Sequence, residues 1–393
     1  MINFKIFLTN TIYRKRLTKA IVEKLHTYLV GFWLCISFRK DKVKISIPKK
    51  NLFDEKDLDL SKKIFEFYKR MKIDQLQVNS AYNPSSMWQD HIDIDYKYLK
   101  DAYETNNLKN FSYFLQNFGN WENYLGIENQ TFIKNYSKNI FSKKFLTNRI
   151  VYDQKKLWEY FNQNNQELSE LDMPRYGNQC GILIDHNIFN PGLGGFFTNV
   201  YSEIINKYLK KDKKNTILEI GGGYGKLAYF ILKKQKNCCY IGLDIPEVLI
   251  LGAYYLSKCF PEKKIFLYGQ EKFNNNILQD YDLIFLPGWE IENISEDTVD
   301  MSMNKNSLGE MNPETAKKYL KHVNRISKYF FSMNHEFFRN KFSENNYSLI
   351  NKEFNLDNNF KELIRYPDIS HMTYKNNKID LDSDIFFYMY EKN

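Results

Sequence analysis

The chain has 393 residues, of which 43% are hydrophobic and 26% charged. This composition is typical of globular proteins and excludes a disordered chain or a fibrous repeat, and the length predicts two or three packed units. The net charge of +9 looks evenly spread, with short lysine clusters beside apolar segments, as at 210–214 and 233–236, where exposed helix ends explain them. We therefore expect no nucleic-acid partner, which would require a concentrated basic stripe.

The five cysteines are odd in number and include no C-x-x-C pair, so the sequence predicts neither a disulfide framework nor a zinc site. The first fourteen residues lack the continuous apolar core and cleavage site of a signal peptide. We therefore expect a cytoplasmic protein, with the inner face of the membrane left open by the segment described next.

An uncharged run at 25–38 lies between basic residues at 14–16 and 39–40. It is too short to span a bilayer, which takes about 20 residues. Two interpretations stay open for 14–40: an interfacial anchor that gives peripheral membrane contact, and a helix docked on the protein core. We favour the docked helix.

Residues 1–150 are predicted to form a mainly helical N-terminal domain with an acceptor-side or interaction role. Its apolar residues recur at steps of three and four, as in Leu99, Ala102 and Tyr103. Residues 151–200 concentrate glycine, asparagine and proline, which predicts a loop-rich lid or linker.

Residues 201–393 show short apolar strands that alternate with helical patterns, which predicts an α/β domain with a mostly parallel sheet. The expected strands are 216–220, 238–243, 264–268, 281–286, 298–303 and 329–332. The expected helices are 226–234, 246–259 and 313–326. Ligands of such sheets bind at the carboxyl ends of the strands.

The most informative stretch is 219–225, which reads EIGGGYG between a predicted strand and a predicted helix. A dinucleotide fingerprint starting at Gly221 would need glycine where Lys226 stands. A phosphate loop would need glycine where Ile220 stands and a hydroxyl where Leu227 stands. The remaining pattern, acidic-x-Gly-x-Gly-x-Gly, resembles that of S-adenosylmethionine (SAM)-dependent methyltransferases, although a glycine turn from another nucleotide-binding fold stays an alternative.

The residues of this pattern have a physical sense as a SAM site. Glycines at 221, 223 and 225 let the backbone approach a ligand without a Cβ clash, and Glu219 attracts positively charged groups. Asp244, 19 residues after Gly225, ends the next strand and is expected to receive the two ribose hydroxyls. We therefore expect SAM to be bound by Glu219, Gly221, Gly223, Tyr224, Gly225, Asp244 and Pro287.

Further segments make the chain similar to a bacterial family of sugar O-methyltransferases, over roughly residues 90–340. The matching positions are 177–178, 181, 218–225, 227–229, 243–247, 254–256, Asp300, Asn304, Ser307, 310–311, 319–320 and Asn334. The resemblance implies a Rossmann-like SAM-dependent methyltransferase domain that transfers a methyl group to a sugar or glycan hydroxyl in lipopolysaccharide or capsule biosynthesis. It also implies substrate contacts from Asn178, Asn304 and Asn334.

Candidate catalytic bases follow the later strands, where they would project from the ligand edge. They are Glu310 and His335, with the pair at 185–186 as a third candidate. A helix-start carboxylate and a polar loop cluster are the structural alternatives for Glu310 and His335. We predict no metal, because no paired aspartates or tight His/Asp cluster occur.

Two aromatic residues each have two alternative positions. Tyr224 either packs near the cofactor or faces the preceding domain, and Trp289 either lines the substrate pocket or belongs to the core. The residues that face adenine depend on which segment forms the third strand of the sheet. They are 270–271 if this strand is 264–268, and Pro287 and Gly288 if it is 281–286.

Two rival functions remain. One is a same-fold methyltransferase that acts on a non-sugar small molecule or a protein. The other is a non-catalytic binding subunit that keeps the fold.

Overall fold

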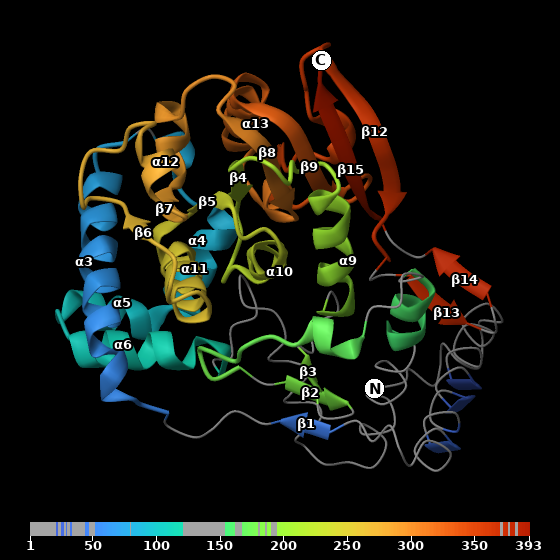
Figure 1. Cartoon of the computed structure of the whole chain (residues 1–393), viewed down its shortest axis with the longest axis horizontal. Helices are drawn as coiled ribbons and strands as arrows, with labels where there is room; N and C mark the ends of the chain where they lie inside the picture. The colour runs from blue at the N-terminus through green and yellow to red at the C-terminus, as the bar shows by residue number, and fades with distance from the viewer. Residues whose placement is uncertain are drawn as a thin grey trace.

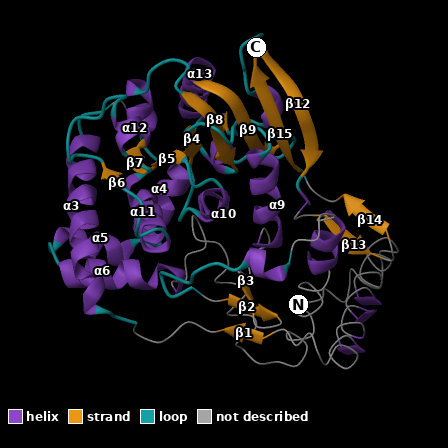
Figure 2. Cartoon of the chain, viewed as in Figure 1, coloured by secondary structure: helices purple, strands orange, loops and turns teal. Residues whose placement is uncertain are grey.

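The computed structural model of the chain is shown in Figures 1 and 2. The residues that it describes are 21–22, 25–26, 29, 32–33, 44–46, 52–78, 80–120, 154–161, 167–179, 181–184, 187–189, 195–369, 372–375, 378–381 and 384–393. The pair at 185–186, the third candidate for a catalytic base, lies outside them.

An eight-stranded sheet forms the centre of the molecule, and its strand order is β12-β15-β9-β8-β4-β5-β7-β6. The strands are β4 (Asn215–Ile220), β5 (Cys238–Asp244), β6 (Ile265–Leu267), β7 (Leu283–Pro287), β8 (Val299–Lys305), β9 (Ser327–His335), β12 (Phe360–Pro367) and β15 (Ile385–Lys392). Six of them run parallel from β9 to β6, whereas β15 is antiparallel to both β9 and β12. The predicted α/β class with a mostly parallel sheet is confirmed.

Helices connect the parallel strands, as parallel pairing requires. They are α10 (Lys226–Lys234), α11 (Pro246–Cys259), the short α12 (Ile277–Asp280) and α13 (Pro313–Ile326). Proline stands at the start of α11 and of α13, where its missing N–H costs nothing. Every residue of β4 and β7 is buried, which explains why β7 is continuously apolar in sequence, whereas β4 also buries Asn215, Thr216 and Glu219.

The chain reverses its direction across the sheet at β4. From β4 it proceeds to β5 and β7 on one side, and then returns to place β8 on the other side of β4. The connections that leave the carboxyl ends of β4 and β8 therefore diverge, and such a switch point opens a crevice for a ligand.

Two strands extend at least two residues further at their carboxyl ends than predicted. The expected strand at 298–303 runs to Lys305, and the one at 329–332 runs from Ser327 to His335. Asn304 and Asn334 look like loop residues in the sequence, but both are fully buried in their strands because the Asn334 amide Nδ2 donates to Asn304 Oδ1 at 2.9 Å. The sequence left open whether 264–268 or 281–286 lies next to β5. In the structure β7 pairs with β5, and β6 is the edge strand.

Helices before the sheet pack beside α11 (blue and teal in Figure 1). They are α3 (Leu58–Gln75), α4 (Ser86–Ile94), α5 (Lys97–Glu104) and α6 (Leu108–Asn117). α3 packs on α6 and on α11, with the Phe65 and Phe111 rings stacked at 4.4 Å between centroids. The described part of 52–120 is therefore mainly helical and rests on the sheet domain.

The stretch 151–200 holds regular elements among its described residues. Strands β2 (Gly181–Ile184) and β3 (Asn187–Phe189) pair with each other, and β2 pairs with β1 (Lys44–Ser46). Helix α9 (Gly195–Asn206) begins before the boundary expected at 201 and packs on α10. The described part of 151–200 thus contains short helices and strands as well as loops.

Asp57 makes a buried ionic contact between the N-terminal helices and α11, in addition to the pair of Lys72 with the buried Glu247 at 2.9 Å. Asp57 is 8% exposed, accepts a hydrogen bond from the Tyr254 hydroxyl at 2.6 Å and forms an ion pair with Lys258. Asp57→Ala would leave both partners without their acceptor, so we expect the free energy of unfolding to fall by about 2 kcal/mol. Urea denaturation measures this. Asp59→Ala, at an exposed aspartate in the same turn, is the control and should cost at most about 1 kcal/mol; equal losses would contradict the assignment.

Candidate active site

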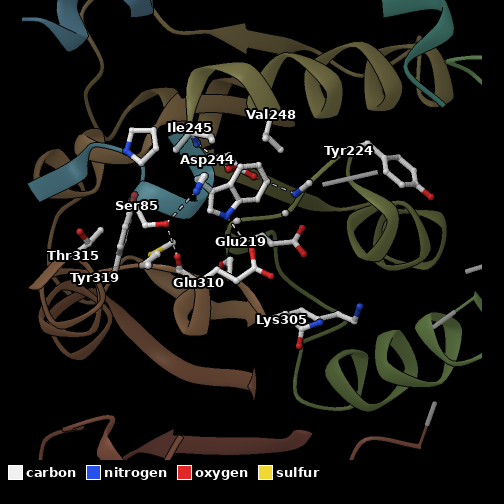
Figure 3. A pocket seen from close by; sticks show the side chains of 18 of the residues that line it. Ser85, Glu219, Tyr224, Asp244, Ile245, Val248, Lys305, Glu310, Thr315 and Tyr319 are labelled. Carbon is white, nitrogen blue, oxygen red and sulfur yellow. Dashed lines mark hydrogen bonds between the residues drawn. The ribbon is translucent and has the colours of Figure 1, made fainter. Parts of the chain in front are cut away.

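A cavity of about 280 Å³ lies where the switch point predicts it, at the carboxyl ends of β4, β5 and β8 (Figure 3). Its walls come from the glycine loop at 221–224, from 244–245 after β5, from 305–307 with Glu310 after β8, and from 82–85 with Trp88 in the N-terminal helical region. The cavity thus joins three strand ends to a segment more than 100 residues earlier in the chain.

The glycine loop can adopt its path only because it lacks side chains. Gly221, Gly223 and Gly225 have φ of +70°, +59° and +90°, in the left-handed region that glycine favours. A Cβ on Gly221 would lie 2.1 Å from Ser307 Oγ, and one on Gly222 would lie 2.8 Å from Glu219 Oε2. The loop is therefore in close contact with the loop after β8 on one side and with the Glu219 carboxylate on the other.

Asp244, the last residue of β5, is held by two backbone N–H groups. Gly223 N donates to its Oδ2 at 3.1 Å and Ile245 N donates to its Oδ1 at 2.8 Å. Burial raises the pKa of Asp244 to about 7 against these stabilising bonds. Because a carboxylate has about four lone-pair sites, two remain for a ligand.

Glu219 stands one residue before the end of β4 and is 2% exposed. Its Oε2 accepts a hydrogen bond from the Tyr240 hydroxyl at 2.6 Å. Burial raises the pKa of Glu219 to about 7, and this effect outweighs both the bond from Tyr240 and the nearby Lys305 charge. The site thus contains two acidic groups whose ionised forms a cation would stabilise.

Glu310 ends the short turn η6 (Ser307–Glu310) and faces the same cavity. The Trp88 indole Nε1 donates to Glu310 Oε2 at 3.0 Å, and the Ser85 hydroxyl donates to the Glu310 carbonyl oxygen at 2.9 Å. Burial raises the pKa of Glu310, and the Trp88 bond lowers it in part. A carboxylate with a raised pKa binds a proton more strongly than an exposed one, which suits a general base.

Asn306 was not foreseen as a site residue. It follows β8 with φ of +68° and lines the cavity, and its buried Oδ1 accepts no hydrogen bond. An unpartnered buried carbonyl costs free energy, so its place in a cavity wall suits a ligand that brings a donor.

Asn304 and Asn334 were expected to contact substrate, and the structure corrects this. The Asn304 amide donates to the Ile220 carbonyl at 2.8 Å, and Asn334 Oδ1 accepts from Gly309 N at 3.1 Å. Both side chains are fully buried beneath the cavity, where they hold the turn that carries Glu310.

His335, the second candidate base, lies away from the cavity. It is the last residue of β9 rather than part of a following loop, and its Nδ1 is 3.0 Å from Asp384 Oδ2. It is not among the residues that line the cavity. Because its strand lies beyond β8, the geometry favours Glu310 over His335 as the base.

Tyr224 lines the cavity, but its ring points away from the acidic groups (Figure 3). The ring packs against Phe118 and Tyr255, at 5.7 Å and 5.1 Å between centroids. The second of its two expected positions, facing the preceding domain, is the one found.

Four further predicted site residues do not line the cavity. Gly225 is the N-cap residue of α10. Asn178 is buried and donates to Asn117 Oδ1 at 2.8 Å, and Trp289 is buried edge-on against Tyr268. Pro287 is the register partner of Asp244 at the same edge of the sheet, but it lies outside the cavity wall. The structural contacts of Asn178 and Trp289 replace the substrate contacts expected for them.

The N-terminal contribution was missed by sequence reasoning. Asn83, Pro84 and Ser85 precede α4, and Ser85 caps that helix by accepting from Trp88 N at 3.4 Å. Such a cap signature is visible in the sequence. Its contact with Glu310 is not, because 222 positions separate Trp88 from Glu310.

Within the described ranges, no three His, Cys, Asp or Glu side chains gather as a metal site would need. The absence of a metal stays a prediction.

No protein-family model and no curated protein sequence matches the chain. Among solved structures, the chain is similar to the CurJ carbon methyltransferase, with a TM-score of 0.34, 16% identity and coverage of 50% of this chain and 54% of that one, so the matched part spans about half of CurJ. It is also similar to the mitomycin 7-O-methyltransferase MmcR, with a TM-score of 0.32, 12% identity and coverage of 63% and 70%. A third is the Burkholderia thailandensis 1,6-didemethyltoxoflavin-N1-methyltransferase with bound S-adenosylhomocysteine, with a TM-score of 0.32, 12% identity and coverage of 50% and 78%. These TM-scores are too low to carry an inference, so the fold and the function below are argued from this chain's own residues.

The raised pKa of Glu219 predicts that this residue destabilises the protein without ligand. Its pKa in the folded chain, about 7, lies above the ordinary 4.5, so the wild type loses stability as the pH rises between these values. Glutamine can still accept from Tyr240 but does not ionise. We therefore expect Glu219→Gln to raise the free energy of unfolding by about 2 kcal/mol at pH 8 and by little at pH 4.5.

Chemical denaturation at both pH values checks this. Glu262→Gln, at an exposed position, is the control and should change stability by less than about 0.5 kcal/mol. A Glu219→Gln variant that is less stable than wild type at pH 8 would contradict the interpretation that ionised Glu219 destabilises the folded protein.

Proposed function

We propose that the protein is a SAM-dependent O-methyltransferase that methylates a sugar hydroxyl in surface-glycan biosynthesis. The observation that carries the proposal is the meeting of three carboxylates around one cavity, beside a glycine loop at the switch point of the sheet. Glu219 is buried, and Asp244 and Glu310 are partly exposed. The resemblance of the sequence to sugar O-methyltransferases supports the acceptor class.

The residues present fit the cofactor. Glu219 offers negative charge to its sulfonium and amino groups, and the remaining lone pairs of Asp244 suit ribose hydroxyls. The side chain that Gly222 lacks would fill the space next to Glu219, and Asn306 Oδ1 offers an acceptor without a partner of its own. When bound, the cofactor supplies a methyl group already activated by its sulfonium charge.

Glu310 is the group of this chain that would remove the proton from the acceptor hydroxyl. Its carboxylate faces the cavity and is fixed by Trp88, so it needs little reorganisation before it accepts a proton. A positioned base contributes about 10²–10⁴-fold to rate. The walls that hold the acceptor against the cofactor contribute more, up to about 7–11 kcal/mol through alignment.

The acceptor side of the cavity has the mixed character that carbohydrates need. Tyr82 and Trp88 offer aromatic surface for C–H faces, while Asn83, Ser85 and Thr315 carry polar groups near the same wall. All but Thr315 come from the N-terminal helical region, which supports its acceptor-side role.

Glu310→Gln tests the catalytic assignment. We expect methyl transfer to fall by about 10²–10⁴-fold while SAM affinity stays within about threefold of wild type, because the lost group acts on the acceptor. Transfer from labelled SAM to glycans, together with calorimetric SAM titration, measures both quantities.

Asp244→Ala is the matched variant and should lose SAM binding. Wild-type protein that binds no SAM would overturn the proposed function altogether. Transfer only to small alcohols or proteins would overturn the sugar acceptor while leaving the methyltransferase intact.

Trp88→Phe tests how Glu310 is tuned. Glu310 must be ionised to act as a base, so kcat/KM decreases when the pH is lowered below the pKa of Glu310. The Trp88 N–H lowers that pKa, and its removal should therefore move the acid limb of the kcat/KM profile to higher pH.

Tyr82→Phe is the control, because Tyr82 lines the same cavity but donates to Glu292. Its acid limb should stay in place. If the acid limb of the kcat/KM profile stays in place in Trp88→Phe, the ionisation of Glu310 does not determine that limb.

A further inference from the structure

The described residues near the N-terminus carry an exposed apolar face. Seven positions between 21 and 33 are helical and exposed, and six of them are large hydrophobic residues with exposed fractions between 47% and 68%. These six, which we call the N-terminal apolar face, are Ile21, Val22, Leu25, Leu29, Phe32 and Trp33. The segment is drawn in dark blue at the lower right of Figure 1.

The spacing of these residues places them on one side of a helix. Steps of three and four bring positions 21, 25, 29 and 32 into line, with 22, 33 and the exposed His26 beside them. The sequence favoured a helix docked on the protein core, and the exposed fractions of the described residues show that this side of the helix faces outward. A contiguous apolar face with Trp and Phe on it is unusual for a surface that meets only water.

The positive charge of the chain is concentrated in the same region. Residues 1–50 hold 12 Lys and Arg against two Asp and Glu, whereas the other 343 residues hold 44 against 45. The excess is therefore not evenly spread, as the lysine clusters had suggested. The whole positive balance of the protein belongs to the segment that carries the apolar face.

We propose that the N-terminal apolar face binds the surface of an anionic lipid bilayer. An apolar helical stripe with Trp and Phe, set in a basic segment, matches the chemistry of a membrane interface, where rings and aliphatic chains enter the headgroup boundary and Lys and Arg meet anionic lipids. Across the described residues no helix has the length and apolar character of a membrane span, so the contact is peripheral.

Charge separates this partner from the other two that such a face suggests. A second copy of the chain would bring ten more net positive charges against the first ten, which repel. A nucleic acid would satisfy the lysines and arginines but would leave the apolar face in water. An anionic bilayer satisfies both features at once.

The test is co-sedimentation of the full chain with vesicles. We expect binding to vesicles of phosphatidylglycerol and phosphatidylcholine, little binding to pure phosphatidylcholine, and a strong decrease at 0.5 M salt because screening weakens the charge contact. Leu29→Glu should lower the partition coefficient roughly tenfold or more, since it places a charge in the centre of the apolar face. Leu76→Glu makes the same change at an exposed leucine outside the segment, with an exposed fraction of 88% against 68% for Leu29, and should bind as wild type does.

The fluorescence of Trp33 reports membrane binding in the wild-type protein. Its emission should shift to the blue on addition of anionic vesicles, and the shift should disappear in Trp33→Phe. No sedimentation, equal binding to neutral vesicles, or an unaffected Leu29→Glu would each overturn the proposal. Self-association without vesicles that Leu29→Glu abolishes would identify an interface between copies instead. None of these outcomes depends on methyl transfer.

Discussion

The carbonyl oxygen of Ile220 holds together the two loops that form the site. It accepts from the Asn304 amide at 2.8 Å and from the Ser307 hydroxyl at 2.9 Å, so the end of β4 is bonded to the start of the turn after β8. The loops are then so close that residue 221 has no room for a Cβ, which explains the glycine there. Glu219 near the end of β4 and Glu310 on the turn after β8 face one cavity because this spacing is fixed.

The electrostatics of the site lowers the stability of the protein without ligand and favours the binding of a cationic ligand. Burial opposes the ionisation of Glu219, Asp244 and Glu310, and within the described residues the polar partners named above offset only part of that effect. A cationic ligand or a set of donated hydroxyls would lower all three pKa values and recover the lost free energy. The groups that destabilise the empty site are thus the ones that would bind most strongly, a conflict between stability and function common at active sites.

What the sequence predicted well was local, and what it missed depended on contacts between distant residues. The glycine loop and Asp244 form one strand-turn-helix-strand unit, whose pattern is written in consecutive residues. Asn304 and Asn334 were assigned to the substrate from the family resemblance, and nothing local in the sequence shows that their amides bond to each other across β8 and β9. The N-terminal wall and the extra length of β9 were missed for the same reason.

The N-terminal region joins the two proposals. Trp88 and Ser85 close the cavity from this region, and the N-terminal apolar face precedes them in the same part of the chain. A freely diffusing nucleotide sugar would gain nothing from an enzyme held at a bilayer. An acceptor carried on a lipid would meet the enzyme at a higher effective concentration, since both would be confined to one surface. Together, the two proposals therefore favour a lipid-linked glycan over a soluble sugar as the acceptor of the proposed reaction.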